Sequence, residues 1–184
     1  MERVYQSILS HLDFDGKGQI LDVGCGSGAL SIRAALVWPQ ARVLGIDAWP
    51  PAYNYSQRMC AKNAKSEGVS GRCRFQRGDA NKLDFPDGRF DAVVSNYVYH
   101  NITGADRQAL LLETLRVLKK GGVFALNDEM KPRLYGDMEA FAQKLRDMGY
   151  EDVRLIDTAT EAFGSCRRAA MMMLGASRML VGRK

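Results

Sequence analysis

The chain alternates short apolar runs with amphipathic stretches, and this alternation limits the folds that it can form. Seven runs have the length and the β-branched content of buried strands. They are Gln19–Gly24, Ala41–Asp47, Cys73–Gly78, Phe90–Asn96, Val123–Asn127, Asp152–Asp157 and Ser177–Val181. Helical stretches lie between most of them, which is typical of βαβ units around a parallel sheet. The pattern therefore predicts an α/β fold with helices on both faces of one sheet.

Four of the expected helices are marked by the residues at their ends. They are Ser27–Trp38, Tyr53–Glu67, Thr103–Leu118 and Tyr135–Met148. The first ends before Pro39, which cannot continue a helix. The second and the fourth precede Gly68 and Gly149, and glycine readily takes the left-handed conformation that follows a last helical turn. In the third, Thr103 and Asp106 have the spacing of a capping box.

Length and composition fit one packed domain. The chain has 184 residues, of which 46% are hydrophobic and 26% are charged. A chain of this size can bury a core without covalent cross-links. We therefore expect residues 1–184 to form a single domain.

No segment predicts export or a membrane span. The longest apolar runs are far shorter than the roughly 20 residues that cross a bilayer as a helix. Met1 is followed by Glu2 and Arg3 rather than by the apolar segment of a secretory signal. The expected location is therefore cytoplasmic.

Charge and cysteine content narrow the range of partners. The net charge of +5 is a modest excess, which a solvated basic face explains more simply than a nucleic-acid groove. The four cysteines, Cys25, Cys60, Cys73 and Cys166, form no C-x-x-C pair, and the chain has only two histidines. Because zinc needs convergent thiolates or imidazoles, no metal site is predicted.

A glycine-rich stretch at residues 20–30 predicts a nucleoside site. A buried strand runs through Gly24, Gly26 and Gly28 directly into a helix. Glycine permits positive φ and close approach of a ligand to the backbone, at the positive end of the helix dipole. Asp47 ends the next strand, where a carboxylate can accept both ribose hydroxyls of an adenosine-containing cofactor.

These residues leave the identity of the cofactor open. The spacing of Gly24, Gly26 and Ala29 also satisfies the dinucleotide-binding fingerprint, which tolerates alanine at its third position. The glycines could also serve only as a tight turn between strand and helix.

Over roughly residues 19–128, the chain resembles the class I S-adenosylmethionine-dependent methyltransferases. Asp22 and the three glycines match the acidic-x-Gly-x-Gly-x-Gly pattern of that family, and Asp47 resembles its second acidic position. Further similar stretches follow in the family's order: Gly78–Ala80, Phe85–Asn96 and Leu115–Phe124.

The resemblance implies a Rossmann-like, doubly wound sheet of seven strands in a three-layer α/β/α arrangement, mostly parallel with one late antiparallel strand. It implies S-adenosyl-L-methionine as cofactor and S-adenosyl-L-homocysteine as product. The residues that it assigns to the cofactor are Asp22, Gly24, Cys25, Gly26, Gly28, Asp47, Ala48, Asp79, Ala80 and Asn96. Asp47 is expected on the ribose, and Asp79 with Ala80 on the adenine. Asp22 could instead brace the loop, and Asp79 could be a turn residue.

The predicted function is transfer of a methyl group from S-adenosylmethionine to an unidentified acceptor. An NAD(P)-binding oxidoreductase and a non-catalytic nucleoside-binding module are the alternatives. The oxidoreductase is disfavoured because the chain has no room for a separate catalytic domain. In addition, none of its seven tyrosines has a lysine four places later, the pairing that short-chain dehydrogenases use.

Residues that follow the fourth strand are expected beside the acceptor, because ligands of open α/β sheets bind beyond the carboxyl ends of the strands. Asn96 could position the substrate or the methionine part of the cofactor, and His100 could accept a proton near neutral pH. Tyr97 and Tyr99, with Trp49 after the second strand, could line the cleft. Plain packing would also explain the tyrosines, and a hydrogen bond within the loop would explain His100.

The same segment favours a small-molecule substrate. Enzymes that methylate the amines of bases or glutamine usually carry two prolines where this chain has Tyr97 and Val98. The chain also lacks a Pro-Cys pair, which disfavours the cysteine nucleophile of cytosine-C5 methyltransferases. The core is more similar to the group that includes quinone- and sterol-type enzymes.

Few residues are available to cover the site. One short helix is expected before the first strand, and residues 158–175 contain Arg167, Arg168 and three consecutive methionines. The methionines could form an adaptable apolar wall or belong to a buried helix. So little covering sequence favours an open site, a lid from a second subunit in a homo-oligomer, or a chain shortened at its N-terminus.

Overall fold

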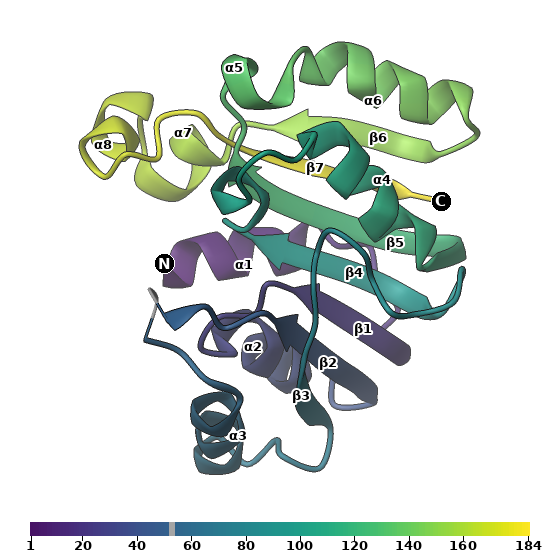
Figure 1. The fold of residues 1–184 in the computed structure, drawn as a ribbon, viewed down its shortest axis with the longest axis vertical. Coiled ribbons are helices and arrows are strands. Elements are labelled where there is room, and N and C mark those ends of the chain that lie inside the picture. The colour runs from purple at the N-terminus through teal and green to yellow at the C-terminus, as the bar shows by residue number, and fades with distance from the viewer. Residues whose placement is uncertain (52–53) are drawn as a thin grey trace.

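One seven-stranded sheet with helices on both faces makes up the described part of the chain (Figure 1). The computed structural model describes residues 1–51 and 54–184, except for the side chain of residue 166. The strands are β1 (Gly18–Val23), β2 (Ala41–Asp47), β3 (Cys73–Arg77), β4 (Phe90–Asn96), β5 (Leu118–Glu129), β6 (Glu151–Ile156) and β7 (Ser177–Arg183). The helices are α1 (Glu2–Ser10), α2 (Ala29–Val37), α3 (Gln57–Ser66), η2 (Tyr99–Asn101), α4 (Arg107–Arg116), α5 (Pro132–Tyr135), α6 (Met138–Asp147), α7 (Thr158–Phe163) and α8 (Cys166–Met171). Within the described residues, no helix has the length and apolar character of a membrane span.

The strand order confirms the predicted fold class. It runs β3-β2-β1-β4-β5-β7-β6, and β7 is antiparallel to both β5 and β6 whereas the other pairs are parallel. The direction in which successive strands are added reverses between β1 and β4. In open α/β sheets, a crevice for ligands forms at the carboxyl ends of the strands at such a reversal.

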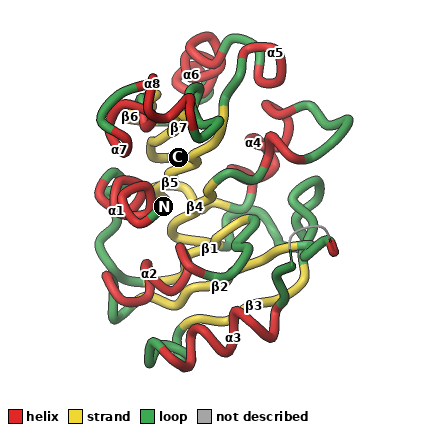
Figure 2. The backbone as a smooth tube through the Cα atoms, turned by 90° about the vertical axis from the view of Figure 1, so that its left-hand side faces the viewer, coloured by secondary structure: helices red, strands yellow, loops and turns green. Residues whose placement is uncertain are grey.

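Two apolar clusters pack on opposite faces of the sheet, as the layers in Figure 2 show. One contains buried residues of α1, α2, α3 and α7, and the other contains buried residues of α4, α5 and α6. Along β4, Ala92 and Val94 belong to the first cluster and Val93 to the second. This alternation is why successive residues such as Ala92, Val93 and Val94 of a central strand are all apolar.

The start predicted for the helix 103–118 is wrong. α4 begins at Arg107 rather than Thr103, because the Asp106 side chain caps it and accepts hydrogen bonds from Gln108 N and Ala109 N. Aspartate is among the best N-cap residues, and its carboxylate pairs two backbone donors that the first turn leaves without partners.

Other boundaries also differ from prediction. β5 extends from Leu118 to Glu129, so its polar beginning was missed. The predicted helix 135–148 corresponds to α6, which begins only at Met138, because Gly136 at a φ of 68° separates it from the short helix α5. The helix expected from residue 53, which lies outside the described residues, begins at Gln57 behind the N-cap Ser56.

Candidate functional site

The loop that joins β1 to α2 is fixed by backbone hydrogen bonds to the end of β2. Gly24 N and Cys25 N donate to Ile46 O at 2.8 and 2.9 Å. Gly24 and Gly26 have φ values of 70° and 55°, a conformation that costs glycine little and other residues more. The loop therefore depends on glycine and brings bare backbone to the sheet edge.

Gly28 has another part in this loop. It is the N-cap of α2, with a φ of 82°, and a Cβ there would lie 2.8 Å from the Phe75 ring. Among the described residues, it is not part of the cavity wall. In this structure Gly28 turns the chain into the helix and leaves room for Phe75, and its contact with a cofactor stays a prediction.

Asp22 lies inside β1 and is almost completely buried. Ser31 Oγ donates to its Oδ2, which ties the strand to α2 across the loop. Burial raises the pKa of Asp22 from 3.8 to about 7, although the hydrogen bonds from Ser31 lower it in part. Asp22 therefore braces the loop, and it also contributes to the cavity wall described below.

Asp22→Asn should stabilise the protein at pH 8 by about 1–4 kcal/mol, because the ionised carboxylate pays a burial penalty that an amide avoids. A raised folded-state pKa means that wild-type stability falls as pH rises from about 4 to about 7. The advantage of the variant should therefore vanish below pH 4. Denaturant melts across this range measure it, with the exposed Asp84→Asn as control; a constant difference between wild type and variant would contradict the assignment.

Asp47 joins the glycine loop to the segment after β2. Gly26 N donates to its Oδ2 at 2.9 Å, and Trp49 N donates to its Oδ1 at 2.6 Å. Trp49 Nε1 in turn donates to Gly26 O at 2.8 Å. Carboxylate oxygens accept more than one hydrogen bond, so Asp47 can bind a ligand hydroxyl while it holds the loop.

A cavity of about 420 Å³ opens at the carboxyl ends of the central strands. All the predicted cofactor residues except Gly28 lie in its wall. Trp49 and Tyr97, two of the three residues predicted to line the cleft, lie there as well. The folded chain therefore brings together predicted site residues as far apart in the sequence as Asp22 and Tyr97.

The wall of the cavity is acidic. It includes the carboxylates of Asp22, Asp47 and Asp79, and no Lys or Arg is among its described residues. Asp79 Oδ1 also accepts hydrogen bonds from N and Nδ2 of Asn81 at 2.8 and 2.7 Å, which closes the turn after β3. Such a wall favours a ligand that carries positive charge.

A buried hydrogen-bond network fixes the end of β4. Asn127 Nδ2 donates to Asn96 Oδ1 at 2.9 Å, and Tyr97 N donates to Asn127 O at 2.9 Å. The Tyr97 hydroxyl lies 2.7 Å from Ser177 Oγ, and Thr158 Oγ1 contacts both Ser177 Oγ and Asn127 Oδ1. The network holds Tyr97 at a φ of 56°, which is strained for a bulky residue, and places its ring in the wall of the cavity.

Tyr99 does not line the cavity, so that prediction is wrong. Its side chain is fully buried, and its hydroxyl lies 2.9 Å from Thr114 Oγ1 of α4. The positive φ of Tyr97 ends the strand, and the chain turns into η2. Strand alternation, which had placed both tyrosines on one face, therefore no longer applies.

His100 lies next to the cavity but is not among the described residues of its wall. Its ring centroid is 6.4 Å from that of Tyr97, and its Nδ1 hydrogen-bonds to Oδ1 of the buried Asp128. Tyr99 N and Glu129 N also donate to the Asp128 carboxylate, at 2.7 and 2.6 Å. Asp128 was not predicted, although its place at the end of β5 could have suggested it.

Other cavity residues come from segments that the sequence already placed near the site. Val98 and Asn101 follow β4, Tyr55 follows β2, and Tyr5 belongs to the helix before β1. Asn81 and Ile102 were not singled out, and the only signal for them in the sequence is their position after β3 or β4.

Comparison with known proteins identifies the family of this chain. Residues 20–122 match a family model described as a methyltransferase domain. The demethylmenaquinone methyltransferase of Symbiobacterium thermophilum is 32% identical over 132 residues, which are 71% of this chain and 50% of that protein. The release factor glutamine methyltransferase of Chlorobaculum tepidum is 42% identical over 102 residues, which are 54% of this chain and 32% of that protein. The chain thus spans half or less of the length of these relatives.

A solved structure has the same fold. Geranyl diphosphate methyltransferase, in complex with GPP and sinefungin, superposes with a TM-score of 0.76 at 13% identity, over 99% of this chain and 78% of that chain. Because the family model covers more than half of the 184 residues, the chain belongs to the methyltransferase-domain family, of the class I S-adenosylmethionine-dependent type.

Proposed function

We propose that the chain binds S-adenosylmethionine in this cavity and transfers its methyl group to a small apolar acceptor, with S-adenosylhomocysteine as product. The observation that carries the proposal is the meeting of the glycine loop, Asp47 and Asp79 around one acidic cavity. Its volume of about 420 Å³ falls in the usual range of small-molecule sites. Membership of the methyltransferase-domain family supports the reaction.

Each part of the cavity has its own task in this proposal. Asp47 accepts hydrogen bonds from the ribose hydroxyls, while Asp79 and Ala80 bind the adenine. Gly24 and Gly26 let the methionine part lie against backbone. When bound, the sulfonium supplies an activated methyl group, and the chain's own contribution is to orient the acceptor and to exclude water.

The charge of the wall favours this cofactor over a dinucleotide. S-adenosylmethionine carries a sulfonium and an ammonium, whereas NAD and NADP carry a pyrophosphate. Asp47 and Asp79, with no Lys or Arg among the described residues of the wall, favour the former over the latter. The oxidoreductase alternative is weakened accordingly.

Tyr97 and Asn96 form the acceptor end of the proposed site. The network that reaches Thr158 and Ser177 holds both residues in one arrangement. A side chain so fixed loses little conformational entropy when an acceptor packs on it. We assign Tyr97 to the wall that positions the acceptor.

His100 is the candidate base, and Asp128 is the residue that orients it. With Nδ1 bonded to Asp128, the imidazole presents Nε2, for which the described residues provide no partner. A ring fixed in this way can take a proton from an acceptor that arrives protonated. The same pairing also shapes η2, so the catalytic role needs its own test.

The acceptor class follows from the relatives and from the segment after β4. Demethylmenaquinone, named for one similar protein, is a small molecule with an apolar isoprenoid chain. The release factor enzyme acts, by its name, on glutamine. Tyr97 and Val98 replace the prolines expected of enzymes that methylate glutamine or base amines. This supports a small apolar acceptor over a protein or nucleic acid.

The acceptor class can be tested with S-adenosylmethionine that carries a radioactive methyl group. The protein is incubated separately with a bacterial lipid extract, total RNA and total protein. Label in the lipid fraction is the expected result, and label in RNA or protein would overturn the acceptor class. Binding of S-adenosylhomocysteine without transfer to any fraction would indicate a non-catalytic nucleoside-binding module.

His100→Ala should lower the rate of label transfer by about 100-fold, a typical contribution of general-base catalysis. Affinity for S-adenosylhomocysteine should stay within about 2-fold, because His100 is outside the cavity wall. His11→Ala, which changes the other histidine of the chain, is the matched control. An unchanged rate for His100→Ala between pH 6 and pH 9 would remove His100 from the mechanism.

The proposal treats residues 1–184 as one domain. All seven strands belong to one sheet, and the cavity draws on loops after β1, β2, β3 and β4. One sheet and one cavity that join loops from along the chain support this single-domain assignment.

A further inference from the structure

A group of apolar side chains at the end of α8 is unusually exposed. Met171, Met172 and Met173 have exposed fractions of 80%, 58% and 79%. They are the three most exposed large hydrophobic residues in the described part of the chain. Monomeric proteins seldom expose adjacent apolar side chains without a use for them.

The structure fixes this exposure. Ala169 of α8 is completely buried, and its carbonyl accepts a hydrogen bond from Leu174 N at 2.9 Å. Met173 has a φ of 61°, which is strained for a residue of its size. Glycine or asparagine would adopt this turn more easily. Strain of this kind in an exposed residue suggests that the side chain has a function.

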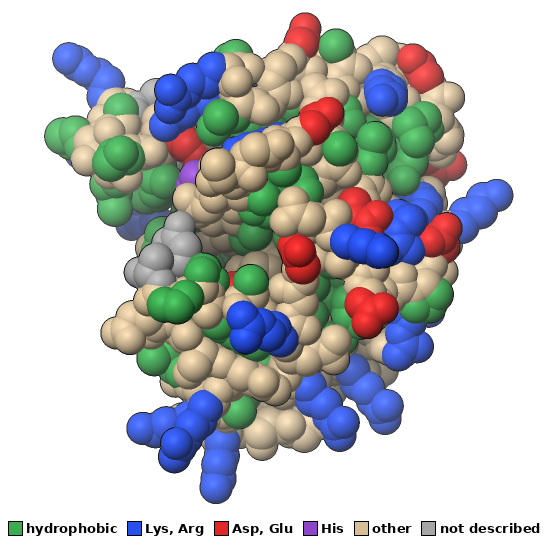
Figure 3. Space-filling view, in the orientation of Figure 1, with side chains coloured by type: hydrophobic (Ala, Val, Ile, Leu, Met, Phe, Trp, Pro, Cys, Tyr) green, Lys and Arg blue, Asp and Glu red, His purple; other side chains and the backbone are tan. Residues whose placement is uncertain are grey.

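Two arginines accompany the methionines. Arg167 and Arg168 are exposed on the same helix, and neither forms an ion pair with the described residues. The one acidic residue of residues 158–175 is Glu161, whose carboxylate is hydrogen-bonded to Ser7 and His11. Figure 3 shows hydrophobic and basic side chains next to each other where α8 projects. We call Arg167, Arg168 and residues 171–173 the methionine patch.

The chemistry of the patch fits an anionic lipid surface. Apolar side chains enter the boundary between headgroups and acyl chains, while arginines bind lipid phosphates. A symmetric contact with a second copy would place the same arginines near their own copies, without an acidic group in the patch to compensate. Charge complementarity therefore favours a membrane over self-association.

The patch lies at the same edge of the sheet as the cavity. Residues 158–175 connect the end of β6 to the start of β7, and Ser177 of β7 pairs with Glu129 at the carboxyl end of β5. The cavity also opens at the carboxyl ends, beside Asp47 and Asn96. In Figure 1, α7 and α8 project from the edge toward which β4 and β5 point.

We propose that the methionine patch docks the protein on anionic membranes, with the sheet edge that holds the cavity turned toward the lipid. An acceptor dissolved in the bilayer would then reach the site without crossing water. This last step rests on the proposed function, whereas the docking itself requires neither cofactor nor reaction.

Co-sedimentation with vesicles tests the docking directly. The full chain is mixed with vesicles of phosphatidylcholine alone or of phosphatidylcholine and phosphatidylglycerol in equal parts, without cofactor. Binding to the anionic vesicles is expected, and it should weaken as salt is raised. Arg167→Glu with Arg168→Glu should lower the affinity by at least about 25-fold, since each arginine near such a surface contributes about 5-fold. Changing all three methionines to serine should lower it by at least about 10-fold.

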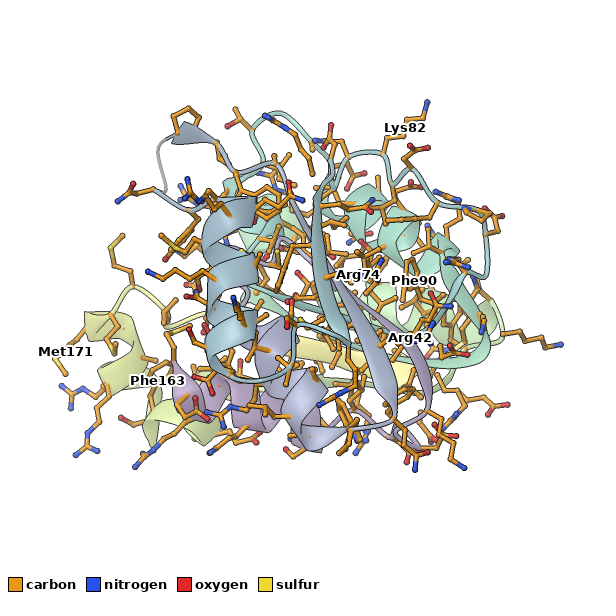
Figure 4. The ribbon with its side chains drawn as sticks, turned by 90° about the horizontal axis from the view of Figure 1, so that it is seen from below. Arg42, Arg74, Lys82, Phe90, Phe163 and Met171 are labelled. Carbon is orange, nitrogen blue, oxygen red and sulfur yellow. The ribbon has the colours of Figure 1, made fainter. Side chains whose placement is uncertain are left out.

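Two control variants are matched to these changes. Arg42→Glu with Arg74→Glu alters net charge equally, and Figure 4 shows both residues far from Met171. Leu36→Ser with Val37→Ser removes two exposed apolar side chains at the end of α2, at the opposite edge of the sheet. Affinity should change by less than about 3-fold in each control, because neither pair belongs to the patch.

Three outcomes would overturn the proposal. The first is that the wild type does not bind anionic vesicles, and the second is that patch and control variants lose affinity equally. The third is that sedimentation velocity shows a dimer, and that the patch variants dissociate it whereas the control variants do not. A separate titration with S-adenosylhomocysteine distinguishes failure of docking from failure of the proposed function. If both hold, the patch variants should bind this compound normally but transfer less label to lipid in vesicles.

Discussion

Asp47→Ala is expected to weaken the binding of S-adenosylhomocysteine by at least about 150-fold, which corresponds to ~3 kcal/mol. Hydrogen bonds to a carboxylate are worth about 1.5–3 kcal/mol each, and the proposed site gives Asp47 two ribose hydroxyls. The substitution also removes the acceptor of Gly26 N and Trp49 N, so the loop loses its tie to β2. Isothermal titration calorimetry measures the change.

The control for this variant is Asp84→Ala, at an exposed carboxylate outside the cavity wall. It should bind S-adenosylhomocysteine like the wild type. A thermal melt of Asp47→Ala shows whether the variant is folded under the conditions of the titration. Wild-type affinity in folded Asp47→Ala would mean that the ribose binds elsewhere or that the ligand is not a nucleoside.

Gly24→Ala should destabilise the protein by about 2–4 kcal/mol and weaken binding of S-adenosylhomocysteine at least about 10-fold. The backbone there has a φ of 70°, and a Cβ would lie 2.2 Å from a methyl group of Val98. No carbon contact is that short, so the loop or the segment after β4 must move. Both border the cavity, which is why stability and affinity should fall together. Denaturant melts and calorimetry provide the two readouts.

Gly68→Ala is the control that separates the cost of a positive φ from the cost of a steric clash. Gly68 has a φ of 72°, but a Cβ there meets no atom within 4 Å. Its substitution should cost only ~1 kcal/mol and leave affinity unchanged. Equal effects of the two substitutions would show that the contact between Gly24 and Val98 does not constrain the site.

The arrangement of strands and helices was largely predictable because the buried strands are short, apolar and separated by clear helix signals. The polar beginning of β5 was not: residues 119–121 are Lys, Lys and Gly, and this segment belongs to the sheet through the pairing of Leu118 with Phe90 and the backbone hydrogen bond between Gly121 and Lys184. The start of α4 was misplaced because Thr103 and Asp106 are both good caps. Which of them acts is decided by the course of the preceding loop.

Residues of the proposed cofactor site were predictable where they end parallel strands. Gly24, Gly26 and Asp47 follow β1 or end β2, and parallel strands bring their carboxyl ends to one edge. The pairings of His100 with Asp128 and of Tyr97 with Ser177 join residues 28 and 80 positions apart. No local pattern marks such pairs, since the first depends on the register between β4 and β5 and the second also on that between β5 and β7.

Tyr99 shows a further limit of reading a strand from its sequence. Period-two alternation holds only while the backbone stays extended. Tyr97 leaves that conformation at a φ of 56°, and Tyr99 then points toward α4 instead of the cavity. The strain at Tyr97 is created by the network around Asn127, which the sequence of β4 does not contain.

The central claim is that the acidic cavity binds S-adenosylmethionine, and calorimetric titration of the purified protein with S-adenosylhomocysteine tests it most directly. NAD and NADP are titrated in parallel under the same conditions. We predict binding of S-adenosylhomocysteine with a Kd in the micromolar range, about −8 kcal/mol, and no measurable binding of either dinucleotide. Binding of a dinucleotide alone would contradict the account and shift the assignment to hydride transfer.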